Sequence, residues 1–271
     1  MPAPAPTRRR LPQPPPAAPE EELNDDTYRC EVVDRHLISG PNRRLEELQL
    51  LWGVFKDFLR GFRALHFVGP CITVFGSARF KEDHPYYKMA RAVGASLAQE
   101  GFTVMTGGGP GIMEAANRGA KDVDGRSVGC NIVLPFEQHA NPYLDRWVNI
   151  DYFFVRKVLL VKYSYGFVIM PGGFGTMDEM FEALTLIQTK KISHFPMVVM
   201  GSEFWTEARQ FLDQMVKEGT ISPEDLELIR FTDDPKEAAQ FITERAIKQF
   251  GLRRHIIPQR SVLLGEEALV D

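Results

Sequence analysis

The stretch FVIMPGGFGTMDE, residues 167–179, indicates most directly how this chain folds. Its apolar first part is typical of a buried strand, its glycines predict a tight turn, and the residues that follow begin a helix. We expect Thr176 near the N-cap of this helix, with Asp178 and Glu179 in its first turn. The turn could hold a phosphate through backbone N–H groups and one hydroxyl, which would come from Gly172, Gly173, Gly175 and Thr176.

The same alternation of strand and helix continues along the chain from Pro70 onward. Short apolar runs predict strands at 71–75, 102–106, 127–133, 167–170 and 197–200. Helices are expected between and after them, at about 85–99, 111–121, 153–163, 175–190, 203–218 and 235–249. Strands that alternate with helices form a parallel sheet, and their connections are right-handed. The sequence therefore predicts an α/β fold with a Rossmann-like, doubly wound parallel sheet, helices on both faces, and ligands beyond the carboxyl ends of the strands.

We predict one nucleotide-binding catalytic domain at residues 65–250, preceded by a helical extension at 29–64. In the extension, a helix at 43–62 has one apolar face that we expect to pack against the main domain, formed by Leu45, Leu48, Leu51, Phe55 and Leu59. Residues 1–28 are rich in proline and contain little that could pack, so a disordered tail is predicted there. Residues 251–271 are expected to form a C-terminal tail.

Composition excludes several classes of function. The chain has 271 residues and a net charge of −4, so it lacks the general basic field that favours nucleic acid. Cys30, Cys71 and Cys130 lie far apart without a C-x-x-C pair, which disfavours a disulfide framework or zinc ribbon and fits a reducing cytoplasm. No apolar run is long enough for a membrane span. The six histidines are scattered, so no metal site is expected.

Two further glycine loops follow predicted strands. In the first, residues 75–79, Ser77 offers a hydroxyl and Arg79 a fork of donors suited to phosphate or carboxylate. An ordinary turn followed by a surface arginine would explain this loop equally well. In the second, GGGPG at 107–111, glycine amides can approach a ligand closely before a helix starts. This loop lacks G-x-G-x-x-G spacing after the first strand, which disfavours an NAD-dependent enzyme.

The charged residues near these loops allow two interpretations. Glu179 lies three residues beyond Thr176, which is the spacing of a helix capping box. The same helix also carries a polar stripe suited to a pocket wall, at Glu182, Thr185 and Gln188. Arg156 and Lys157 come near the start of a helix, where cations gain little from the dipole unless an anion faces them, although a solvated pair is equally compatible.

Three motifs in this order resemble the LOG family of cytokinin riboside 5′-monophosphate phosphoribohydrolases, which is often mislabelled as lysine decarboxylase. They are GGGPGIME at 107–114, Arg156-Lys157, and PGGFGTMDE at 171–179. The resemblance implies a Rossmann-like homodimer that works without a cofactor. By motif it implies that Arg156 and Glu179 are the catalytic pair, that the phosphate turn is Gly172, Gly173, Gly175 and Thr176, and that Lys157, Glu182, Gly108 and Gly109 line the site. At 153–155 the chain has FFV where plant-type members commonly have Met-His-Glu, which bears on the base that is accepted.

The sequence thus favours a hydrolase that cleaves the N-glycosidic bond of a small nucleoside 5′-monophosphate, either AMP or an N6-modified AMP. In this hypothesis Glu179 stabilises the positively charged ribose and activates water, while Arg156 holds Glu179 or the sugar in position. The alternative is a nucleotide sensor or carrier that has the phosphate turn without the chemistry. Glycine loops alone do not separate the two.

Overall fold

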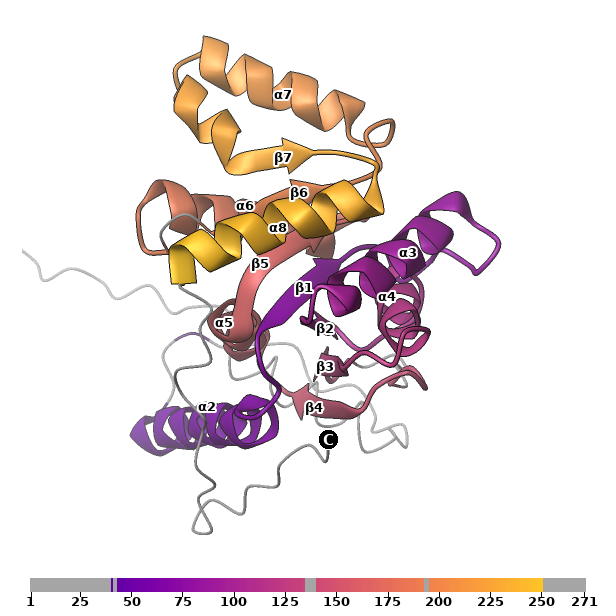
Figure 1. Cartoon of the computed structure of the whole chain (residues 1–271). Helices are drawn as coiled ribbons and strands as arrows, with labels where there is room; N and C mark the ends of the chain where they lie inside the picture. The colour runs from indigo at the N-terminus through magenta and orange to yellow at the C-terminus, as the bar shows by residue number, and fades with distance from the viewer. Residues whose placement is uncertain (1–39, 41–42, 135–139, 193–194, 251–271) are drawn as a thin grey trace, which may run out of the picture.

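The computed structural model describes residues 40, 43–134, 140–192 and 195–250, so the predicted tails at 1–28 and 251–271 lie outside the described residues. Its centre is a seven-stranded sheet in the order β4-β3-β2-β1-β5-β6-β7, in which every pair of neighbours is parallel (Figure 1). The strands are β1 Cys71–Phe75, β2 Thr103–Thr106, β3 Ser127–Ile132, β4 Arg146–Ile150, β5 Ser164–Ile169, β6 Met197–Val199 and β7 Ile229–Phe231.

Helices cover both faces of this sheet. They are α2 Arg44–Leu65, α3 Pro85–Gln99, α4 Ile112–Lys121, α5 Phe153–Tyr163, α6 Phe174–Gln188, α7 Thr206–Lys217 and α8 Pro235–Phe250, with a 3-10 turn at Pro223–Leu228. One core cluster joins the sheet to α2, α5, α6 and Trp205, and the other joins it to α3, α4 and α8. In β1, Cys71 and Phe75 belong to the first cluster, whereas Ile72 and Val74 belong to the second. This alternation is expected for a parallel strand buried on both sides, and the predicted doubly wound α/β fold is confirmed.

The sheet is wider than the sequence predicts, because β4 and β7 are absent from the predicted strands. Both are edge strands with partly exposed residues, and β4 mixes charged and polar residues with apolar ones. A half-exposed edge strand has no continuous apolar run, which is the signal that identified the five others. The five predicted strands and the six helices from residue 85 onward are all present, with ends that differ by a few residues.

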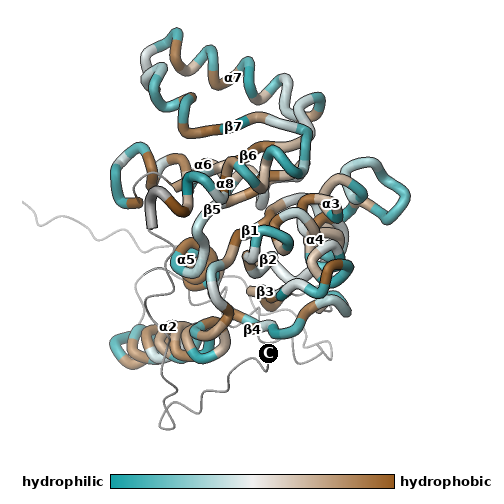
Figure 2. Tube along the Cα trace, viewed as in Figure 1, coloured by the Kyte–Doolittle hydropathy of each residue, from teal (hydrophilic) through white to brown (hydrophobic). Residues whose placement is uncertain are grey.

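The predicted helix at 43–62 is present as α2, but it packs through a different face. The apolar residues predicted to be buried are largely exposed, with Leu45 at 73%, Leu48 at 59%, Leu51 at 62% and Phe55 at 53%. A Cβ on Gly61 would lie 2.3 Å from Leu159 Cδ1, so any larger residue there would require the Leu159 side chain or the helices to shift. Figure 2 shows brown, hydrophobic stretches along α2 as well as in the sheet. Periodicity identified the helix, but contacts with α5 decide which of its faces is buried.

Among the described residues, no helix combines the length and apolar character needed to cross a membrane.

Candidate active site

A pocket of about 640 Å³ opens where the carboxyl ends of β1 and β5 meet. The chain winds outward from β1 to β4, then returns to the other side of β1 with β5, so this is the point where the winding direction reverses. Open α/β sheets bind ligands at such a point. The residues that line the pocket are Phe75, Gly76, Ser77, Ala78, Arg79, Gly107, Met113, Ile132, Leu134, Phe153, Arg156, Gly173, Phe174, Gly175, Thr176, Met177 and Glu179.

The glycine turn at the start of α6 forms one side of this pocket. The helix begins at Phe174 with Gly173 as its N-cap, and the amides of Thr176 and Met177 both donate to the Gly173 carbonyl. Among the described residues, the amides of Phe174 and Gly175 have no acceptor, so they are available to an anion. This agrees with the predicted roles of Gly173, Gly175 and Thr176 as pocket residues.

The start of α6 also removes the capping interpretation of Glu179. Because the helix begins at Phe174, Thr176 is its third residue instead of its N-cap, and no side chain caps this end. Glu179 therefore lies in the second turn. Gly172 does not line the pocket. A Cβ at this position would lie 2.1 Å from Thr176 Oγ1, so the glycine makes room for the threonine side chain.

The Glu179 side chain is only 5% exposed, and its carboxylate makes no hydrogen bond or ion pair with the described part of the chain. Burial raises the pKa of Glu179 to about 7, against the opposing effect of the nearby Arg156 and Lys157 charges. Glu182 and Asp178 add a smaller upward shift to this pKa. An acid with a pKa near neutrality can both accept and donate a proton under physiological conditions.

Arg156 reaches the pocket from α5 and is held by the carboxyl end of β3. Its Nε donates to the Cys130 carbonyl at 2.9 Å. A Cβ on Gly107 would lie 2.3 Å from Arg156 Nη2, so this glycine makes space for the guanidinium. The family motif predicts Gly108 and Gly109 as site residues but does not single out Gly107. The three consecutive glycines were the signal, but only the position of Arg156 distinguishes among them.

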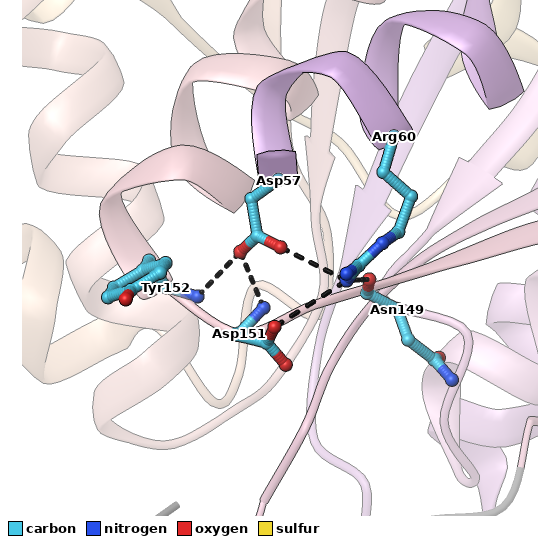
Figure 3. A network of polar contacts seen from close by, with 5 residues as sticks. All are labelled: Asp57, Arg60, Asn149, Asp151 and Tyr152. Atoms are coloured by element: carbon cyan, nitrogen blue, oxygen red, sulfur yellow. Dashed lines mark hydrogen bonds and ion pairs between the residues drawn. The ribbon is translucent and has the colours of Figure 1, made fainter. Parts of the chain in front are cut away.

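The start of α5 is fixed by α2 through a buried carboxylate (Figure 3). Asp57, which is 1% exposed, accepts hydrogen bonds from the backbone amides of Asp151 at 2.7 Å and Tyr152 at 3.1 Å. Arg60 donates to Asp57 at 3.0 Å and to the Asn149 carbonyl at 2.8 Å. Because these amides directly precede α5, the N-terminal helix sets the position of the element that carries Arg156.

Four residues expected by motif to line the site lie outside the wall that the described residues form. Lys157 forms ion pairs with Asp178 at 2.7 Å and with Glu182 at 2.9 Å. The carbonyls of Gly108 and Gly109 accept hydrogen bonds from Asn141 Nδ2 at 3.2 and 3.1 Å. Lys157 and Glu182 thus satisfy each other, and Gly108 and Gly109 belong to a buried structural network.

Ser77 lines the pocket as expected, and its hydroxyl oxygen accepts a hydrogen bond from the Arg79 amide at 3.1 Å. The remaining wall is largely apolar, which sequence reasoning did not anticipate. Met113, Ile132, Leu134 and Phe153 form part of it. These residues resemble ordinary core residues in sequence, so no motif distinguishes them. Within the described ranges, no group of three histidine, cysteine or acidic side chains is placed to hold a metal ion.

The fold and the pocket together define a Rossmann-like α/β protein with a candidate ligand site at its topological switch point. A family model described as "Possible lysine decarboxylase" matches residues 113–242. A cytokinin riboside 5′-monophosphate phosphoribohydrolase of Mycobacterium tuberculosis is 30% identical over 155 residues, which are 56% of this chain and 82% of that protein. This chain therefore belongs to the LOG family, as its motifs predicted.

Other relatives differ in size and in name. A pyrimidine/purine nucleotide 5′-monophosphate nucleosidase of Escherichia coli K12 is 27% identical over 190 residues, or 65% of this chain, but the match covers only 41% of that protein. Among solved structures, the Moco carrier protein from Chlamydomonas reinhardtii superposes with a TM-score of 0.50 and 25% identity, over 66% of this chain and 98% of the carrier. Relatives with this fold thus include proteins named as hydrolases and one named as a carrier.

Proposed function

We propose that this chain hydrolyses the N-glycosidic bond of a nucleoside 5′-monophosphate, AMP or an N6-modified AMP, to free base and ribose 5-phosphate. The observation that carries the proposal is the buried, unpaired carboxylate of Glu179 in the same pocket as the free amides that begin α6. The names of the M. tuberculosis and E. coli relatives support the same reaction class. A carboxylate and an anion site in one pocket suit a substrate with a phosphate and a reacting sugar.

The chemistry follows from how this bond breaks. As the C–N bond lengthens, positive charge develops on the ribose and the base departs with the bonding electrons. Glu179 in its ionised form stabilises that positive charge and accepts a proton from the attacking water, whose oxygen bonds to the anomeric carbon. The proton that Glu179 took from the water then passes to the departing base, directly or through solvent, which restores the ionised form of Glu179. Arg156 lowers the pKa of Glu179 below the value that burial alone would produce, which increases the ionised fraction at neutral pH.

The remaining walls place the two ends of the substrate. The amides of Phe174 and Gly175, with the Thr176 hydroxyl, bind the 5′-phosphate and help to position the ribose for attack. The apolar wall that includes Ile132, Leu134 and Phe153 accepts the base through stacking and burial of its faces. In this proposal the reaction uses no cofactor.

A second candidate is a carrier that binds a nucleotide or a nucleotide-like cofactor without cleaving it. The likeness to the Moco carrier protein favours this candidate, because that protein has the same fold at 25% identity. The two proposals differ in one measurable outcome, which is the release of free base.

The deciding experiment incubates pure protein with AMP, GMP, CMP, UMP and an N6-alkylated AMP, and detects free base by chromatography. Glu179→Gln should lower kcat by about 10²- to 10⁴-fold, the usual contribution of a general base, while AMP binding remains measurable. The matched control is Asp178→Asn, which removes the adjacent carboxylate of α6 outside the pocket and should leave kcat within about threefold of wild type. Binding of AMP without base release would favour the carrier, and full activity of Glu179→Gln would exclude the assigned role.

A further inference from the structure

The loop that follows β1 is fixed against the glycine turn of α6. The Ser77 amide donates to the Pro171 carbonyl at 3.0 Å, and the Ser77 carbonyl accepts from the Ile112 amide at 3.0 Å. A Cβ on Gly111 would lie 2.5 Å from the Ser77 carbonyl oxygen, so the start of α4 packs directly on this loop. The loop is therefore held between α4 and the phosphate turn, and its side chains are presented at the pocket edge.

Arg79 is the charged residue of this loop, and it lines the pocket. Its backbone amide donates to Ser77 Oγ, which fixes the local chain. In the part of the chain that the structure describes, its guanidinium makes no hydrogen bond or ion pair, whereas those of Arg156 and Arg118 do. Arg156 donates to the Cys130 carbonyl, and Arg118 pairs with Glu82 at 2.7 Å. The Arg79 donors are thus available to a ligand.

The chemistry of the pocket identifies the group that Arg79 would bind. Among the described residues that line it, the charged ones are Arg79, Arg156 and Glu179, and Glu179 is buried at 5% exposure. The free amides of Phe174 and Gly175 lie on the same pocket, beside the Ser77 and Pro171 contact. A planar guanidinium fork and a set of backbone amides together match the several oxygens of a phosphate monoester.

We propose that Arg79 binds the 5′-phosphate of the substrate together with the first amides of α6, and that it confers preference for nucleoside monophosphates over nucleosides. The inference rests on the proposed function for the identity of the substrate. Arg79 binds the phosphate, whereas Glu179 acts on the reacting sugar. Removing the Arg79 side chain should weaken binding of phosphorylated ligands and raise KM, with little effect on kcat.

The test measures binding of AMP and of ribose 5-phosphate by calorimetry in the Glu179→Gln protein, with and without Arg79→Ala. Loss of a hydrogen-bonded charge should weaken both ligands by about 10- to 100-fold. Arg79→Lys should restore part of the affinity, since lysine supplies charge without the bidentate fork. Arg245→Ala, an exposed arginine of α8 outside the pocket, is the matched control and should leave both affinities unchanged.

Kinetics of the active protein separate this inference from the proposed function. Suppose that the wild type releases base from AMP, and that Arg79→Ala raises KM at least tenfold with kcat within about threefold. This result would support both the hydrolase function and the role of Arg79. If the wild type releases no base but Arg79→Ala still weakens AMP binding, the proposed hydrolase function is contradicted and the role of Arg79 is supported. Unchanged AMP affinity in Arg79→Ala, or no AMP binding by the parent protein, would overturn the inference.

Discussion

At the scale of single residues, the site depends on a carboxylate whose surroundings differ from those its sequence position indicates. Glu179 has the spacing of a helix cap after Thr176, yet the helix starts before both residues and leaves the carboxylate in a pocket. Burial is the largest cause of its raised pKa. The same desolvation that destabilises the ionised form makes it a stronger base, which is the property that water activation requires.

This environment predicts how activity depends on pH. If the ionised form of Glu179 is the base, kcat/KM for AMP should rise between pH 5 and 7 and level off above the folded-state pKa of about 7. An unperturbed glutamate would give a rise centred near pH 4.3, because that is its ordinary pKa. Initial rates of base release in buffers of constant ionic strength measure this profile. A flat profile from pH 5 to 8 would contradict the assignment.

Stability provides the control for this prediction, since it needs no turnover. The folded-state pKa is raised, so Glu179 favours folding below its unfolded-state pKa and loses that contribution as pH rises through about 7. Glu179→Gln should therefore raise the free energy of unfolding at pH 8, by on the order of 2 kcal/mol, and have little effect at pH 4. Denaturant unfolding at the two pH values checks the difference.

At the scale of elements, the extension is part of the site because α2 holds α5. Gly53 and Gly61 let the two helices approach closely, and Asp57 lies between them on the same face of α2. The amides of Asp151 and Tyr152, at the start of α5, have Asp57 as their acceptor. Arg156 lies one helical turn after Tyr152, so a displacement of the start of α5 would also move Arg156 in the pocket.

We expect Asp57→Ala to reduce both stability and catalysis. It would remove the buried acceptor that two backbone amides share, at a cost of about 1–3 kcal/mol in the free energy of unfolding. The freed start of α5 should also displace Arg156 and lower kcat for AMP more than it raises KM. Asp57→Asn retains an acceptor oxygen and should recover part of both losses. Equal behaviour of the two variants in denaturant titrations and kinetics would argue against this positioning role.

At the scale of the whole molecule, the winding of the sheet assembles the pocket from segments that lie up to 104 positions apart, from Phe75 to Glu179. The same architecture leaves an apolar surface on α2 and α5. Its exposed members are Leu45, Leu48, Leu51, Trp52, Phe55, Phe153, Phe154 and Val158. A large group of exposed apolar side chains usually marks an interface. The homodimer expected from the family resemblance would bury it.

We therefore predict that the chain is a homodimer, with a mass by light scattering twice the 30.7 kDa of one chain. Trp52 is 60% exposed and stacks on Phe55. Trp52→Glu would place a charge in the buried centre of the interface and should shift the protein to monomers without changing its fold by circular dichroism. Lys236→Glu on α8, which covers the opposite face of the sheet from α2, is the control and should remain dimeric. A monomeric wild type at micromolar concentration would contradict the proposal.

The strands and helices of the central fold could be predicted from sequence because their signals are local. The apolar run at 167–170 and the glycines that follow it specify a buried strand and a turn whatever surrounds them. The edge strands β4 and β7 could not be predicted, since their residues are only partly buried and carry no such run. The choice of Arg156, Glu179 and Thr176 also came from sequence motifs, and all three line the pocket.

By itself, the sequence determined the α/β class, the glycine turn and the family, because each depends on patterns within short consecutive segments. Tertiary structure alone decided that Gly107 and not Gly108 faces Arg156, that Lys157 pairs with Glu182, and that Leu48 of α2 is exposed. Each of these depends on which side chain arrives from another element. Periodicity and spacing describe a segment and its own neighbours, so they contain no information about that distant partner.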